Sequence, residues 1–203
     1  MTGVRGHRNR VRIMTVLRSG GEYEECHVDR LREQCEKHAP DTEFVCLSDI
    51  GGTALLHDWP GWWAKIEVFR FQGPILFVDL DTTIRGDLRP ILDAAACHEF
   101  IALEDFNPRL RKMGSGLMAW GGSMSHIYET FCANPDAHMA KCTTRRHFGD
   151  QGFIEPLTEG RTYWQDILPG SVVSWKKHCK SGVPDDAKIV CFHGKPRPWD
   201  VGQ

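Results

Sequence analysis

The sequence lacks any long hydrophobic run. No window approaches the roughly 18 consecutive apolar residues that a membrane-spanning helix needs. The first stretch, 1–12, is basic but has no apolar segment of the kind found in secretory signals. We therefore expect no membrane span and a cytoplasmic location, with residues 1–10 forming a flexible basic arm.

The chain also lacks an excess of charge of either sign. Its 25 lysine and arginine residues face 27 aspartate and glutamate residues, which gives a formal net charge of −2. This balance argues against a histone-like protein that binds nucleic acid by charge alone. No internal repeat, low-complexity tract or long linker divides the 203 residues, and 41% of them are apolar. We expect one domain over residues 1–203, with a sizeable core.

Paired cysteine motifs are missing as well. The eight cysteines are scattered along the chain, and none of them forms a C-x-x-C pair. Because nothing points to an oxidising compartment, we expect most of them to be buried free thiols. A zinc site made by His178, Cys179, Cys191 and His193 is the alternative. His178 and Cys179 are adjacent in the chain, which makes it difficult for both to bind one tetrahedral zinc ion, so this alternative is disfavoured.

What the sequence does contain is an alternation of strand and helix patterns. Short apolar or β-branched runs predict strands at 12–17, 42–47, 75–78, 100–103, 116–120 and 188–192. Amphipathic spacing predicts helices at 23–38 and 62–71, the second with Trp62, Ile66 and Phe69 on one face. This order is typical of an α/β fold in which helices flank a mostly parallel sheet.

Polar clusters follow three of the predicted strands, at 19–21, 79–81 and 193–195. Because ligands of parallel sheets gather at the carboxyl ends of the strands, we expect these clusters to converge. Asp79 and Asp81 follow the most apolar strand, and two carboxylates this close repel each other unless a cation compensates them. Oxygen ligands suit Mg²⁺ or Mn²⁺, so the pair is a candidate metal site. The alternative is that one aspartate caps a turn while the other is solvated.

Several short motifs occur in order around this aspartate pair. They are Trp63–Phe69, Ile75–Thr83 with Gly86–Leu88, Gly114–Trp120, Asp150–Gln151 and Phe192–Trp199. Together they cover most of residues 11–199, and they resemble motifs of GT-A glycosyltransferases, in particular the glycosyltransferase family 8-like group. The resemblance implies a GT-A-like α/β domain with a mostly parallel central sheet, the fold of nucleotide-diphospho-sugar transferases.

The resemblance also implies a metal site. In family 8-like enzymes two aspartates and a late histidine hold Mn²⁺, which binds the diphosphate of the nucleotide sugar. Here these residues would be Asp79, Asp81 and His193, with Mg²⁺ as the alternative ion. The chemistry supports this, because the sugar leaves as a nucleoside diphosphate whose developing charge a cation neutralises.

Two further cations are expected near the diphosphate. Gly194 and Lys195 are the predicted donor-binding residues of the C-terminal motif, which is compressed relative to the family pattern. The altered spacing leaves either Lys195 or Arg197 for the phosphate role. Lys65 lies inside an apolar helix face, so it needs an anionic partner. The donor, Glu67 and the aspartate pair are the candidates.

Other residues are assigned to the donor by the same resemblance. The first strand and the loop after it, with Thr15 and Tyr23, would hold the base and ribose, Tyr23 by stacking. Asp150 and Gln151 would contact the donor sugar near its reacting carbon, as catalytic residues. Local roles are the alternatives: Tyr23 as a packing residue and Asp150 as a helix cap. Ser115, between two glycines, is placed near the sugar or the acceptor.

The resemblance thus predicts a metal-dependent glycosyltransferase whose expected donor is a UDP-sugar. Its acceptor stays open among a glycan, a protein, a small molecule and a nucleic acid. Basic clusters at 109–112, 141–146 and 176–180 are interpreted as solvated faces.

Two other functions remain as alternatives. The pattern D-x-D-x-T also matches haloacid-dehalogenase-like phosphatases, in which Asp79 would be the nucleophile. In those enzymes the motif normally opens the fold, whereas two predicted strands precede it here. The last alternative is a non-catalytic module that binds a nucleotide or a sugar.

Overall fold

The computed structural model describes residues 10–107 and 112–203, and within them the strands form two sheets. The central sheet has the strand order β3-β2-β1-β4-β7-β6-β8, and a small sheet has the order β5-β10-β9. The expected basic arm at 1–10 and the basic cluster at 109–112 fall almost entirely outside the described residues. None of the helices within the described ranges has the length and apolar character needed to cross a membrane.

The central sheet is mostly parallel. Its strands are β1 (Arg12–Leu17), β2 (Glu43–Ser48), β3 (Thr53–Ala54), β4 (Ile75–Val78), β6 (Ile101–Glu104), β7 (Met113–Trp120) and β8 (Thr162–Tyr163). β1 pairs in parallel with β2 and β4, and β7 runs antiparallel between β4 and β6. Every residue of β4 is buried, as expected for a central strand that is covered on both faces.

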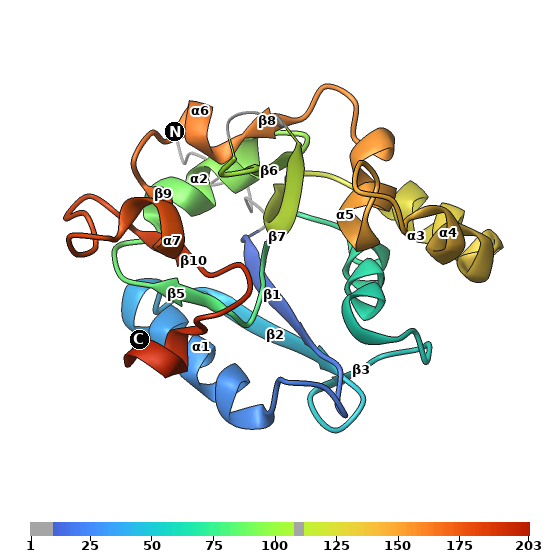
Figure 1. Cartoon of the computed structure of the whole chain (residues 1–203), viewed down its shortest axis with the longest axis horizontal. Coiled ribbons are helices and arrows are strands. Elements are labelled where there is room, and N and C mark those ends of the chain that lie inside the picture. Colours follow the sequence, from blue (N-terminus) through green and yellow to red (C-terminus); the bar gives the residue numbers. More distant parts are fainter. Residues whose placement is uncertain (1–9, 108–111) are drawn as a thin grey trace, which may run out of the picture.

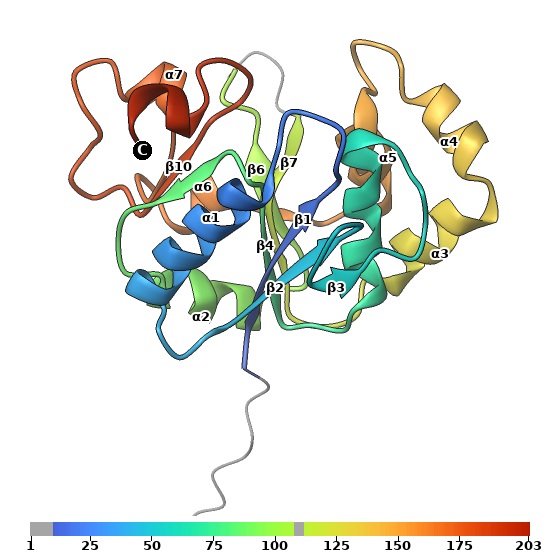
Figure 2. The same cartoon turned by 90° about the horizontal axis from the view of Figure 1, so that it is seen from below.

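Helices cover both faces of this sheet (Figure 2). On one side lie α1 (Glu25–His38) and α2 (Arg89–Cys97). On the other side lie η1 (Gly61–Arg70), α3 (Ser125–Ala133), α4 (Pro135–Lys141) and α5 (Gly149–Ile154). The remaining short helices are η2 (Glu155–Leu157), α6 (Trp164–Ile167), α7 (Trp175–His178) and η3 (Pro198–Val201). The expected α/β class, a mostly parallel sheet flanked by helices, is confirmed.

Each face of the central sheet has its own hydrophobic core. Because side chains alternate along a strand, Ile13 of β1 packs with residues of α1 and α2, whereas Met14 packs with residues of η1 and α3. Trp120, the last residue of β7, is fully buried in the second of these cores. Its ring centroid lies 4.8 Å from that of Phe69 and 6.3 Å from that of Phe100. This aromatic contact joins β7 to η1.

The small sheet brings the C-terminal part of the chain to the aspartate pair. Its strands are β5 (Thr82–Ile84), β9 (Val172–Ser174) and β10 (Ile189–Cys191), with β10 between the other two (Figure 1). The strand predicted at 188–192 therefore exists, but it lies outside the central sheet. The chain re-enters a strand directly after Asp81, and this strand pairs antiparallel with β10. As a result the backbone N–H of Phe192 donates to the carbonyl of Asp81 at 3.2 Å.

The segment predicted as an amphipathic helix at 62–71 is a 3₁₀ helix, η1. With three residues per turn, Trp63, Ile66 and Phe69 share one face, and all three are buried. Trp62 was expected on the buried face, but it is 52% exposed. That expectation was wrong because Trp62 lies in the first turn of η1, before residues 63–69, all of which are buried.

Replacing Trp120 with alanine should lower the free energy of unfolding by about 3–5 kcal/mol, because the change leaves a cavity beside Phe69. Trp120→Phe should cost much less. Phenylalanine keeps most of the ring contacts and removes an indole N–H that has no partner among the described residues. Urea unfolding of both variants checks this, and equal losses would contradict the packing argument.

Candidate active site

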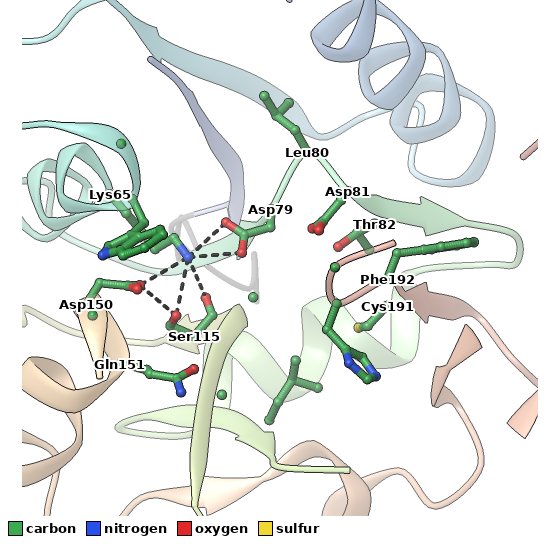
Figure 3. A pocket seen from close by; sticks show the side chains of 18 of the residues that line it. Lys65, Asp79, Leu80, Asp81, Thr82, Ser115, Asp150, Gln151, Cys191 and Phe192 are labelled. Atoms are coloured by element: carbon green, nitrogen blue, oxygen red, sulfur yellow. Dashed lines mark hydrogen bonds and ion pairs between the residues drawn. The ribbon is translucent and has the colours of Figure 1, made fainter. Parts of the chain in front are cut away.

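The polar strand-end clusters converge on one cavity of about 640 Å³. The residues that line it include Gly21 from the loop after β1, Asp79 and Asp81 after β4, and His193 and Gly194 after β10. Figure 3 shows its interior. The cavity therefore lies where the carboxyl ends of strands meet, which is the usual ligand position in α/β sheets.

At one end of the cavity, the ammonium group of Lys65 lies between two carboxylates (Figure 3). Its Nζ is 3.0 Å from each carboxylate oxygen of Asp79 and 3.1 Å from Oδ2 of Asp150. The hydroxyl of Ser115 donates to the same Oδ2 of Asp150 at 2.6 Å. Burial alone would lower the pKa of Lys65, but Asp150 and Asp79 outweigh it and raise that pKa above its ordinary value. The lysine is therefore charged, and it compensates both carboxylates.

A glycine makes room for this arrangement. The backbone N–H of Asp79 donates to the carbonyl of Gly116 in β7 at 2.9 Å. A Cβ atom at Gly116 would lie 3.3 Å from Oδ2 of Asp79, closer than an ordinary contact. Because position 116 has no side chain, the Asp79 carboxylate packs directly against β7 and within reach of Lys65.

At the other end of the cavity, Asp81 is paired with Arg197, which also binds Glu22. The guanidinium of Arg197 donates to Oδ2 of Asp81 and, at 3.1 and 2.6 Å, to the two carboxylate oxygens of Glu22. Burial and the neighbouring Asp79 raise the pKa of Asp81 to about 7, against the opposing effect of Arg197. Hydrogen bonds from Arg197 and Lys195 lower the pKa of Glu22 to about 2. Of the two carboxylates that Arg197 binds, Asp81 is thus less completely compensated than Glu22.

Aromatic contacts hold the C-terminal segment at this end. Trp199 in η3 stacks on His27 of α1 with ring centroids 3.8 Å apart, and it meets Tyr23 edge-on at 5.9 Å. The guanidinium carbon of Arg197 lies 5.3 Å from the centroid of the Tyr23 ring. The loop just before α1, with Gly21 and Tyr23, and the C-terminal segment are far apart in the sequence and together form one side of the cavity.

The aspartate pair suits a divalent cation. Both carboxylates line the cavity, and burial is the main cause that raises the pKa of Asp79 and of Asp81. Close carboxylates with raised pKa values are short of positive charge, which a bound cation would supply. Oxygen ligands of this kind fit Mn²⁺ or Mg²⁺.

The third predicted metal ligand, His193, is engaged in a hydrogen bond. His193 lines the same cavity, but its Nε2 is hydrogen-bonded to the hydroxyl of Ser174 at 2.7 Å. Within residues 10–107 and 112–203, no three His, Cys, Asp or Glu side chains gather as a metal-binding group. Ligation by His193 therefore stays a prediction.

The alternative zinc site does not form among the described residues. Cys179 and Cys191 are buried in different hydrophobic clusters. Nδ1 of His178 accepts a hydrogen bond from the backbone N–H of Ser174 at 3.1 Å. The expectation of buried free thiols fits better, because five of the eight cysteines are buried and none is in a disulfide within the described part of the chain.

Most residues that the sequence assigned to a site line the cavity. They are Tyr23, Lys65, Asp79, Asp81, Asp150, Gln151, His193 and Gly194. Two assigned residues, Thr15 and Lys195, are not among the described residues that line it. Thr15 is fully buried within β1, and its neighbour Val16 lines the cavity because side chains alternate along a strand. Lys195 is exposed and pairs with Glu22 at 2.6 Å, so of the two cations left open Arg197 is the one in the cavity.

Several cavity residues have no site role in the sequence-based assignment, among them Glu22, Trp62 and Phe148. Glu22 follows the Gly20–Gly21 turn and has no motif around it that would reveal its ion pair with Arg197. Trp62 and Phe148 line the cavity although each is 52% exposed. Neither has a sequence signal for this position, since a period of three along η1 groups Trp62 with Lys65 and Val68, which are both buried.

Thr15→Val should raise the free energy of unfolding by about 1 kcal/mol, because the buried Thr15 hydroxyl has no hydrogen-bond partner among the described residues. Valine has almost the same shape and needs no partner. Chemical denaturation of the two proteins checks this. A loss of stability would show that the hydroxyl is hydrogen-bonded in solution.

Arg197→Met should lower the free energy of unfolding by roughly 2 kcal/mol, since it leaves the buried Asp81 without its cation. The loss should be larger near pH 8 than near pH 5, because a carboxyl whose pKa is raised to about 7 is ionised only at the higher pH. Lys195→Met is the matched control. It removes an exposed cation from the same Glu22 and should leave stability nearly unchanged. Equal losses in both variants would refute the assignment.

No protein-family model matches this chain, and no curated protein matches it in sequence. Solved structures do match. The glycosyltransferase GlyE of Streptococcus pneumoniae superposes with a TM-score of 0.62 at 8% sequence identity, over 95% of this chain and 56% of GlyE. The chain thus spans little more than half of that protein.

Two other glycosyltransferases match over most of both chains. The galactosyltransferase LgtC, solved with donor and acceptor sugar analogs, has a TM-score of 0.58 at 11% identity and covers 93% of this chain and 89% of LgtC. A glycosyltransferase involved in glycosylation of the major capsid of PBCV-1 also has a TM-score of 0.58, at 13% identity, over 93% and 96%. At these identities the likeness shows the fold. The chain has the GT-A type fold of these glycosyltransferases.

Proposed function

We propose that the protein is a metal-dependent glycosyltransferase that moves a sugar from a nucleotide sugar, expected to be a UDP-sugar, to an acceptor. One observation carries the proposal. On a GT-A type fold, a single cavity contains the Asp79 and Asp81 pair at its centre, the Lys65 and Asp150 ion pair at one end and Arg197 at the other. Such a cavity offers carboxylates for a metal and cations for a diphosphate.

The metal would be held by Asp79 and Asp81, with His193 as the expected third ligand. When bound, Mn²⁺ or Mg²⁺ would neutralise the charge that develops on the departing nucleoside diphosphate. Arg197 offers a cation beside this position, because its guanidinium contacts Asp81 inside the cavity.

The chain's own residues orient the donor sugar. In transfer, the bond between the anomeric carbon and the diphosphate oxygen breaks, and its electron pair leaves with the diphosphate. An acceptor oxygen forms the new glycosidic bond and loses its proton. Asp150 and Gln151 lie at the start of α5 and line the cavity, where we assign them to the sugar. Lys65 and Ser115 hold the Asp150 carboxylate in a single orientation.

The nucleotide would lie at the other end of the cavity. Gly21 and Tyr23 line that side, next to Arg197, and an aromatic ring there suits stacking on a base. Lys195 pairs with Glu22 but is not among the described residues that line the cavity, so we assign the phosphate role to Arg197.

The two alternatives are less well supported. The fold is that of GT-A glycosyltransferases, which removes the fold argument for a haloacid-dehalogenase-like phosphatase. In addition, Lys65 holds both carboxylate oxygens of Asp79, the nucleophile that a phosphatase would use. A non-catalytic binding module would have the same cavity and differs only in turnover.

We expect UDP to bind about tenfold or more tightly in Mn²⁺ than in EDTA, with GDP and inorganic phosphate as control ligands in the same calorimetric titrations. Asp81→Asn should abolish the effect of Mn²⁺, because it removes one carboxylate from the pair. Asp87→Asn is the control variant, since Asp87 pairs with Arg89 away from the cavity.

Each result has a distinct meaning. Metal-dependent UDP binding followed by slow release of UDP from a UDP-sugar supports a transferase. UDP binding without any turnover of a UDP-sugar panel supports the binding module. Failure of UDP and GDP to bind, together with hydrolysis of a phosphate ester, would establish the phosphatase instead.

A further inference from the structure

We propose that the cavity mouth beside Asp150 binds a sugar ring of the acceptor, on an aromatic platform made by Trp62 and Phe148. The acceptor is accordingly a carbohydrate. This inference rests on the proposed function, which leaves the acceptor open. It is carried by the exposure of the two rings, by their position and by the polar groups next to them.

The exposure of these two side chains is unusual. Among the described residues, large apolar side chains that are well exposed occur at four positions, Ile50, Leu56, Trp62 and Phe148. Ile50 and Leu56 are not among the residues that line the cavity. Trp62 and Phe148 both line it, and their ring centroids are 5.7 Å apart. Two large rings exposed side by side at a cavity mouth indicate a surface that a ligand covers.

The backbone fixes this platform against the candidate catalytic residues. Gly149 separates Phe148 from Asp150 and has a φ of 62°. A Cβ atom at Gly149 would lie 2.9 Å from Nε1 of Trp62, so the indole packs directly on the glycine backbone. The platform is therefore held beside Asp150, with only Gly149 between Phe148 and Asp150 in the chain.

The turn that carries Phe148 is also anchored. Thr143 and Phe148 form an antiparallel bridge, and the backbone N–H of Thr144 donates to the carbonyl of His147 at 3.0 Å. Nζ of Lys112 donates to the carbonyls of Arg145 and Arg146 at 2.6 and 2.9 Å. These bonds fix the turn, so that a ligand meets a preformed surface and orders little of the chain.

The chemistry of the platform matches a sugar ring. A pyranose has one face of C–H groups, which packs on an aromatic ring, and a rim of hydroxyls that need hydrogen-bonding partners. The rings of Trp62 and Phe148 offer a packing surface for the C–H face. The carboxylate of Asp150 and the amide of Gln151, both in the cavity lining, offer hydrogen-bonding partners for the hydroxyls.

The position of the platform favours the acceptor over the nucleotide. Figure 3 shows Lys65, Asp150 and Gln151 on one side of Asp79, with Asp81 on the other. Trp62 and Phe148 lie on the Asp150 side, because both adjoin Gly149. Tyr23 and Arg197, at the nucleotide end, lie on the Asp81 side. A ring on Trp62 and Phe148 would therefore lie beyond the donor sugar, where an acceptor must approach.

The test is binding of the whole chain, loaded with UDP and Mn²⁺, to an array of immobilised neutral and acidic oligosaccharides. Trp62→Ala and Phe148→Ala should each weaken binding to the captured glycans by about tenfold, as expected for loss of an aromatic contact. Both variants should bind UDP like the original protein. Trp62→Phe keeps a ring and should restore most of the glycan binding.

Ile50→Ala and Leu56→Ala are the matched controls, because each removes an equally exposed apolar side chain away from the cavity. They should leave glycan binding unchanged. The proposal fails if the UDP-loaded protein captures no oligosaccharide, or if Trp62→Ala binds glycans normally. It also fails if the Trp62 and Phe148 variants lose UDP affinity to the same extent, which would assign the rings to the donor. Absence of UDP binding in the unsubstituted chain is a separate outcome that overturns the proposed function.

Discussion

Lys65 connects three elements of the structure through one buried charge. It comes from η1, and it binds Asp79 at the end of β4 and Asp150 at the start of α5. Either carboxylate without this cation would carry the desolvation cost of a buried charge, and the lysine alone would carry it too. The three groups are therefore stable only together. Their mutual dependence sets the position of η1 and α5 relative to the central sheet, and with it one end of the cavity.

Asp81 is compensated by a different cation from a distant part of the chain. Arg197 reaches it from the C-terminal segment, which Trp199 holds against His27. Two aspartates separated by one residue thus have separate partners, one on each side of the cavity. A divalent cation bound by the pair would have to share these carboxylates with Lys65 and Arg197, or displace them. Such competition would link metal binding to the position of the C-terminal segment.

The fold is shared with glycosyltransferases at 8–13% sequence identity. Such a likeness is possible because a layered fold depends on the pattern of apolar strands and helices more than on particular residues. In this chain, β1 and β4 lie within the ranges that their apolar runs predict, and α1 begins two residues inside the predicted helix. The aspartate pair follows β4 directly, so its place at the sheet edge follows from the local sequence as well.

Local pattern determined the α/β class, the main strands, and the place of Asp79 and Asp81 at the end of a central strand, because strand and helix periods are properties of neighbouring residues. Asp150 lies on α5, and only tertiary packing brings it to Asp79 through Lys65. Tertiary structure decided which cation enters the cavity, since Lys195 and Arg197 are two residues apart and both bind Glu22, but packing brings Arg197 to Asp81 as well. It also decided the exposure of Trp62. Residues 63–69 of η1 are all buried, whereas Trp62 lies outside the core and meets Phe148 only because the folded chain brings the two segments together.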